Sequence, residues 1–183
     1  EDALKTRVEM ERPVGEEAFI RTTATNGRIQ TVETGPVRLT VELSASANGV
    51  NSLNQQIRLY AGLPFVEFVN TIDKIETTEP EAVYFAFPFS LPEFDVRCEI
   101  SDAVMTPNKQ IEHSCRDWYC IQNWVAFTNS DRTIVWQTSD APLVQLSQIN
   151  TFRWADHLEL RHPSVFSYAL NNYWTTNFKA SQG

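Results

Sequence analysis

Apolar and polar residues alternate in short runs along much of the chain. Within residues 38–43, Leu39, Val41 and Leu43 are separated by polar residues, which predicts a β-strand with one apolar face. Similar runs cover residues 53–60 and 65–75, and turn-forming residues occupy 33–36, 47–49 and 62–64. This spacing is typical of consecutive antiparallel hairpins rather than of parallel β-α-β units.

The second half of the chain repeats the strand pattern. Residues 82–89 are almost wholly apolar, as expected of a strand buried on both faces, and Pro88 stands near its end, where a missing donor is tolerated. Further strands are predicted at 117–129, 132–139, 142–147 and 165–170. Residues 149–160 come closest to helical periodicity, and the match is poor. The pattern therefore predicts one all-β domain over residues 1–183.

Composition narrows the class of protein. Of the 183 residues, 42% are hydrophobic and 11% aromatic, enough for a folded domain with a real core. A net charge of −8 argues against a nucleic-acid partner, and no apolar run reaches the roughly 20 residues needed to span a membrane. Three cysteines cannot all pair within one chain, which favours a reducing compartment and a cytoplasmic location.

Known catalytic and metal-binding motifs are missing from the sequence. The three histidines, His113, His157 and His162, stand apart from one another, and Cys115 and Cys120 are too far apart for a zinc knuckle. His113 lies near Cys115, where a solvated loop is a better interpretation than a metal site. The chain has no glycine-rich phosphate loop and no nucleophile elbow. Asp73 and Asp140 could act in acid–base chemistry, but any globular protein offers such carboxylates, and Asp140 is better placed as a turn former. We therefore predict no catalytic residue, metal site or cofactor in this chain.

The most distinctive segment, residues 167–178, interleaves amides, hydroxyls and aromatic rings. Its members are Asn171, Asn172, Asn177, Thr175, Thr176, Tyr173, Trp174 and Phe178. Sugar sites use this mixture, because rings stack on the C–H faces of a pyranose while amides bond its hydroxyls. A strand end whose asparagines cap turns and whose rings fill a core would have the same composition, and residue chemistry alone favours that alternative.

Four stretches of the sequence are distinctive: QIRLY to NTIDK (56–74), YFAFPF (84–89), SDAPLVQL (139–146) and NNYWTTNF followed by ASQG (171–183). Together they resemble the C-terminal region of bacterial-type glycoside hydrolase family 38, the α-mannosidases. The four occur in the family's order and cover residues 35–183. The resemblance implies a large antiparallel β-sandwich of the galactose-mutarotase-like kind.

The resemblance also implies where the chemistry is located. Family members are retaining exo-α-mannosidases whose Asp nucleophile and zinc ion lie in a separate N-terminal domain. Zinc ligation there includes a His-x-Asp pair, which this sequence lacks. The expected function is a non-catalytic region that buttresses its own catalytic domain, lends loops to the sugar pocket, and contacts α-mannoside substrate only through the full-length enzyme. The alternatives are a stand-alone carbohydrate-binding module and an adhesion or scaffold module.

On this interpretation Asn171, Asn172, Trp174 and Asn177 are candidates for a pocket rim that orients sugar. The same amides could instead tie strands together as a buttress. The chain also stops abruptly at residues 181–183 after an aromatic-rich segment, which predicts a truncated sandwich. Exposed sheet edges would then favour a homodimer.

Overall fold

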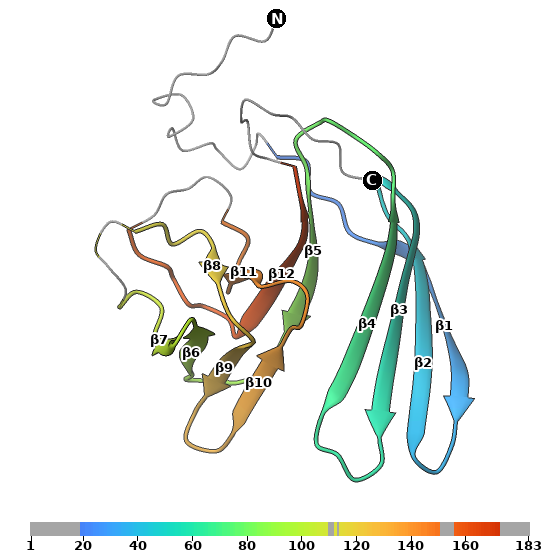
Figure 1. Cartoon of the computed structure of the whole chain (residues 1–183), viewed down its shortest axis with the longest axis horizontal. Coiled ribbons are helices and arrows are strands. Elements are labelled where there is room, and N and C mark those ends of the chain that lie inside the picture. The colour runs from blue at the N-terminus through green and yellow to red at the C-terminus, as the bar shows by residue number, and fades with distance from the viewer. Residues whose placement is uncertain (1–18, 110–111, 113, 151–155, 173–183) are drawn as a thin grey trace, which may run out of the picture. The chain divides into compact units, whose positions relative to one another are not determined.

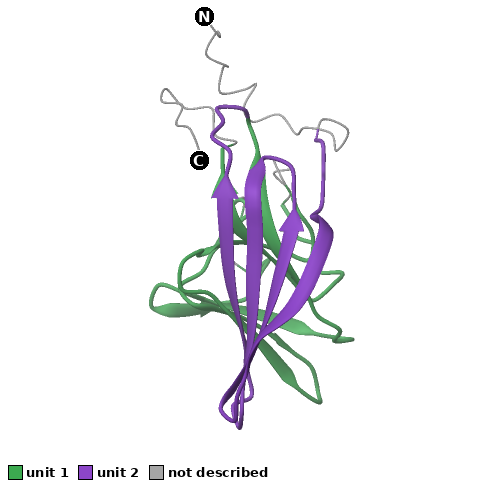
Figure 2. Cartoon of the chain, turned by 90° about the vertical axis from the view of Figure 1, so that its right-hand side faces the viewer, with its two compact units in different colours: residues 1–18, 80–179 green, residues 19–79, 180–183 purple. Residues whose placement is uncertain are grey.

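The computed structural model describes residues 19–109, 112, 114–150 and 156–172. Within these residues the regular elements are twelve strands, arranged as three four-stranded antiparallel sheets, with no helix (Figure 1). The all-β prediction is confirmed. Since the described part has no helix, it has none long and apolar enough to cross a membrane. The chain divides into two compact units, whose described parts are residues 80–172 (unit 1) and 19–79 (unit 2) (Figure 2).

Unit 2 is a single sheet of four consecutive hairpin-linked strands in the order β1-β2-β3-β4. The strands are β1 (Thr25–Thr34), β2 (Arg38–Ser46), β3 (Val50–Tyr60) and β4 (Val66–Lys74). Gly49 and Gly62 occupy the connections after β2 and β3 with φ of 72° and 76°. Side chains with a Cβ rarely adopt this left-handed conformation, so glycine at these positions allows both reversals. The turns predicted at 47–49 and 62–64 are therefore present.

Unit 1 contains two sheets. The first has the order β10-β9-β6-β7, from β6 (Asp95–Ile100), β7 (Ala103–Met105), β9 (Trp124–Thr128) and β10 (Thr133–Gln137). The second has the order β5-β12-β11-β8, from β5 (Ala82–Pro88), β8 (Tyr119–Cys120), β11 (Leu143–Leu146) and β12 (Ser164–Asn171). β12 lies between β5 and β11, so the end of the described chain closes a sheet begun more than 70 residues earlier.

Both sheets of unit 1 contribute to one hydrophobic core, as the two layers of a β-sandwich do. Phe127 of β9 is fully buried, and its ring lies 5.9 Å from Phe89 and 5.7 Å from Phe94. Phe87 of β5 meets Trp136 of β10 at 5.4 Å, which joins the sheets directly. The other buried apolar residues of this core are Leu91, Val96, Cys98, Tyr119, Ile121, Val125, Val144, Leu146, Leu158 and Val165.

The most informative difference between predicted and observed strands lies within residues 117–129. The single strand predicted over 117–129 is wrong, because the structure has two strands there, β8 and β9. β8 pairs with β11 in one sheet, and β9 pairs with β6 and β10 in the other. Ile121 and Gln122 bridge them, with backbone N–H groups bonded to Pro142 and Glu99. An apolar run that crosses between two layers looks like one strand in sequence, because both halves are buried.

Candidate functional site

The predicted amide cluster begins at the end of β12. Asn171 pairs with Ala82, and Tyr168 pairs with Tyr84, so these residues lie at one end of the β5–β12 ladder. The rings of Tyr84 and Tyr168 stack with centroids 4.5 Å apart and planes only 2° from parallel. The Tyr168 hydroxyl donates a 2.8 Å hydrogen bond to Asn171 Oδ1. The sequence-predicted amide is therefore part of an ordered aromatic and polar contact.

Its neighbour Asn172 is held by its backbone. The Asn172 N–H donates a 2.8 Å bond to the carbonyl of Glu81, which extends the ladder beyond the last pair of β12. Both bonds are of the kind expected for a strand-tying role. Trp174 and Asn177 lie outside the described residues, as does His113. The pocket-rim role of the four predicted residues stays a prediction.

Titratable residues in the described part do not gather into a metal centre. No group of three or more His, Cys, Asp or Glu side chains that could hold an ion occurs there. His157 and His162 are exposed. Cys98 is buried in the core, and burial raises the pKa of its thiol to about 12, so the side chain acts as a small apolar residue. Cys115 and Cys120 are exposed thiols outside any disulfide.

Sequence reasoning missed a polar face on the sheet of unit 2. Alternate residues of β2, β3 and β4 face the same way, and the strand register aligns them in rows. One row holds Thr40, Arg58 and Glu67; the next holds Glu42, Gln56 and Val69; the next holds Ser44, Asn54 and Thr71. The signal was available in the alternation of residues 38–44, where Arg38, Thr40, Glu42 and Ser44 separate the apolar positions. The same alternation is expected of any strand with one solvent-facing side, so by itself it does not mark these residues as a site.

At one end of this face, charged groups form a hydrogen-bonded network. Glu33 Oε2 accepts bonds from Arg38 at 2.6 and 2.7 Å and from the Thr40 hydroxyl at 2.9 Å. The bond from Arg38, followed by that from Thr40, lowers the pKa of Glu33 below its ordinary value. The bond from Glu33 in turn raises the pKa of Arg38.

A second carboxylate continues the network across the sheet. Glu67 Oε2 accepts a 2.8 Å bond from the Tyr60 hydroxyl and a 3.2 Å bond from Arg58. The Tyr60 bond, followed by the Arg58 bond, lowers the pKa of Glu67. Arg58 Nη2 also donates to Gln56 Oε1 at 2.8 Å. The network therefore fixes the orientation of the Gln56 amide, which belongs to the next row.

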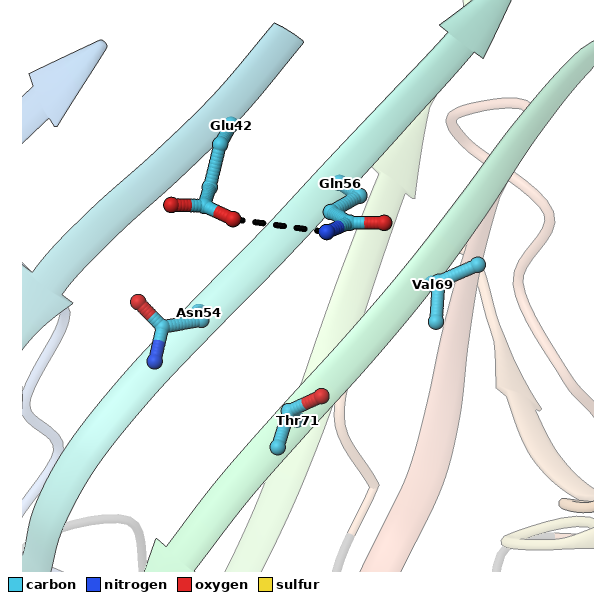
Figure 3. A pocket seen from close by; sticks show the side chains of 5 residues that line it. All are labelled: Glu42, Asn54, Gln56, Val69 and Thr71. Atoms are coloured by element: carbon cyan, nitrogen blue, oxygen red, sulfur yellow. Dashed lines mark hydrogen bonds between the residues drawn. The ribbon is translucent and has the colours of Figure 1, made fainter. Parts of the chain in front are cut away.

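Beside this network lies a shallow hollow of about 300 Å³, lined by Glu42, Asn54, Gln56, Val69 and Thr71 (Figure 3). Both carboxylate oxygens of Glu42 are held by amides: Gln30 donates to Oε1 at 3.1 Å and Gln56 to Oε2 at 3.3 Å. No side-chain hydrogen bond joins Asn54 or Thr71 to another described residue. The hollow thus combines a fixed carboxylate with an amide and a hydroxyl that are open to a ligand.

The opposite face of the same sheet is mainly apolar, and several of its side chains are exposed. It carries Ile29, Leu39, Leu59, Val66 and Phe68, which the register places on one side. Leu59 is 41% exposed, Val66 45% and Phe68 41%. None of the apolar side chains described in residues 19–79 is buried, in contrast to the packed core of unit 1. Exposed apolar side chains gathered on one face are typical of surfaces that contact another layer or partner.

The fold defines the class: an all-β protein whose described residues form three four-stranded antiparallel sheets. Residues 10–137 match the family described as glycosyl hydrolases family 38 C-terminal domain. The match spans every strand from β1 to β10, so it includes all of unit 2 and part of unit 1. The chain belongs to this family, as its sequence motifs predicted. No curated protein and no solved structure matches it.

Proposed function

We propose that this chain is the non-catalytic C-terminal β-sheet region of a retaining, zinc-dependent exo-α-mannosidase, and that it buttresses the catalytic domain of the full-length enzyme. The observation that carries the proposal is the row of exposed apolar side chains on one face of unit 2, in a chain that belongs to the family 38 C-terminal domain. A sheet with an apolar face is stable when a second layer covers that face. The catalytic domain of the same polypeptide is the layer we infer.

The size of the expected stabilisation follows from the exposed area. Fully burying a Leu or Phe side chain contributes about 1.5–3 kcal/mol. Leu59 and Phe68 each keep about two-fifths of their surface accessible, so covering them would add roughly 1 kcal/mol apiece. Together with Ile29, Leu39 and Val66, such a face would contribute several kcal/mol to domain association, reduced by the entropy lost on docking.

Zinc has no assigned place on this chain. The family resemblance locates the zinc ligands and the Asp nucleophile in the N-terminal domain, and the described residues supply no matching donor set. We therefore derive no catalytic step through the metal here. The contribution we propose for this region toward substrate is positional: Asn171, Asn172, Trp174 and Asn177 would orient the mannoside at the rim of a pocket completed by the catalytic domain.

Activity measurements test the proposal directly. The 183-residue chain should not hydrolyse an aryl α-mannoside, whereas the full-length protein should do so and lose activity when a chelator removes zinc. Restored activity on adding zinc back would show that the loss is reversible. Metal-independent turnover by the 183-residue chain itself would contradict the proposal.

Substitutions on the apolar face test the buttressing role separately. The double variant Val66→Ser/Phe68→Ser should destabilise the full-length enzyme more than it destabilises the 183-residue chain, because only the former covers this face. Val104→Ser/Val135→Ser is a matched control, since these valines are 57% and 53% exposed on unit 1. Thermal unfolding of all four proteins measures the difference. Equal losses in both lengths of chain would rule out this face as the docking surface.

A further inference from the structure

We propose that the hollow on the polar face of unit 2 is a binding site for one neutral hexopyranose unit of a glycan. The inference goes beyond the buttressing function and does not depend on it, because the apolar and polar faces lie on opposite sides of one sheet. Its basis is the arrangement of Glu42, Asn54, Gln56, Val69 and Thr71.

The five residues form a compact patch. Glu42, Gln56 and Val69 are directly paired across β2, β3 and β4, and Asn54 and Thr71 are paired in the adjacent row. Neighbouring strands lie about 4.8 Å apart, and rows on one face about 7 Å apart. The patch is therefore comparable in size to a single sugar ring, and all five side chains face the same side (Figure 3).

Two of the polar groups are held in place before any ligand arrives. Gln30 and Gln56 each donate to one oxygen of Glu42, and Arg58 donates to the carbonyl oxygen of the Gln56 amide. Arg58 is itself bonded to Glu67. Side chains fixed by such a chain of bonds lose little conformational entropy when a ligand binds. Long solvated lysine and glutamate side chains on an ordinary surface would not have this property.

The remaining groups determine the chemistry of the ligand. The Asn54 amide offers both a donor and an acceptor, and Thr71 offers a hydroxyl. Glu42 accepts further hydrogen bonds, since each carboxylate oxygen has two lone-pair sites. A pair of neighbouring sugar hydroxyls, each able to donate and accept, satisfies such a set, while Val69 provides apolar contact for ring C–H groups.

The charge and the hydrogen-bonding groups of the hollow disfavour anions and cations as ligands. The hollow itself contains no lysine or arginine, and its one charged residue is a carboxylate. A phosphate or other anion would be repelled by Glu42. A primary ammonium would be attracted by Glu42 and could donate to the oxygens of Asn54 and Thr71, but it would leave the N–H donors of the Asn54 amide unused, because an ammonium cannot accept a hydrogen bond. A neutral polyhydroxyl ligand can accept from the Asn54 N–H group as well as donate to Glu42, so it matches both kinds of group.

Titration of the 183-residue chain with methyl α-mannoside tests the site. Nitrogen-15 NMR of the side-chain amide resonances measures the binding. The Asn54 and Gln56 amide signals should shift and saturate. Asn54→Ala and Glu42→Gln should each weaken the apparent affinity by about tenfold, since each removes or weakens one hydrogen bond to the sugar.

Gln55→Ala is the matched control, because Gln55 lies between Asn54 and Gln56 on β3 and bonds Asn70 on the opposite face. It should leave the affinity unchanged, and thermal unfolding should show that all three variants remain folded. Methyl α-glucoside and N-acetylglucosamine extend the panel if mannoside binds weakly. Absence of a saturable shift with all three sugars, equal loss in Gln55→Ala and Asn54→Ala, or binding of a primary amine alone would overturn the proposal.

Discussion

The carboxylate of Glu33 illustrates how a single partly exposed residue can make stability depend on pH. Arg38 and Thr40 bond its charged form and lower its pKa below the ordinary value of 4.5. A group whose pKa is lower in the folded state contributes stability above its unfolded pKa, and that contribution disappears as pH falls through the folded value. Glu67, held by Tyr60 and Arg58, adds to the same trend.

We therefore expect the Glu33→Gln variant to unfold at a lower temperature than wild type near pH 7 and at a similar temperature near pH 3. The effect should be small, because the pair is at the surface and screened by solvent. Glu76→Gln, an exposed glutamate in the loop after β4, is the control and should follow wild type throughout. Melting curves by circular dichroism across this range measure it. If the melting temperatures of Glu33→Gln and wild type differed by the same amount at every pH, the Glu33 carboxylate would not be the source of the pH dependence.

Substitutions of Asn171 can show whether this side chain ties strands together or binds sugar. Asn171→Ala removes the acceptor of the Tyr168 hydroxyl and should cost about 1 kcal/mol in unfolding free energy. Asn171→Asp keeps an oxygen acceptor at the same place and should cost less.

Urea unfolding of both variants gives the stability, and kinetics of the full-length enzyme give KM. A raised KM without any loss of stability would assign Asn171 to the pocket rim. A loss of stability with an unchanged KM would assign Asn171 to the buttress.

At the scale of the elements, unit 1 depends on the contact between its two sheets. Phe127→Ala should cost about 3–5 kcal/mol, because Phe127 is fully buried on β9 and contacts the rings of Phe89 and Phe94. Val135→Ala, on the exposed side of the neighbouring strand β10, should change stability by less than about 0.5 kcal/mol. Urea unfolding followed by tryptophan fluorescence checks both. A loss below about 1 kcal/mol for Phe127→Ala would contradict the proposed core.

Three of the four strands of unit 2 were predicted from the sequence, but β1 was missed, and the strands of unit 1 were predicted less well. β2, β3 and β4 agree with the runs predicted at 38–43, 53–60 and 65–75, because each alternates polar and apolar residues and ends at a glycine or proline turn. β6 and β7 were missed because they are short and their composition is mixed. β8 and β9 were merged, since no polar break marks the point where the chain changes sheets.

For the whole molecule, the exposed edges and faces predict self-association. β1 is an edge strand of its sheet, and most of its residues are exposed, including Ile29 at 74%. Unpaired strand edges next to apolar surface favour pairing with another chain. We expect the 183-residue chain to dimerise, and Ile29→Lys to shift it toward monomer.

Analytical ultracentrifugation over a range of concentrations measures the association. Ile29→Lys places a charge on the edge strand, and native sheets use such charges to prevent edge pairing. Thr31→Lys on the same strand is a second substitution of the same kind and should act in the same direction. A strictly monomeric species at high concentration would contradict the prediction.

The sequence by itself determined the all-β class, most strand positions and membership of the family 38 C-terminal domain, because alternation, turn residues and motifs are local properties of the chain. Only the tertiary structure decided which residues meet. The polar rows of unit 2 depend on strand register, which brings Glu42, Asn54 and Thr71 together from three strands. The stacking of Tyr84 on Tyr168 likewise depends on pairing between β5 and β12, which are far apart in sequence. Contacts of this kind arise from long-range packing, for which a local pattern carries no signal.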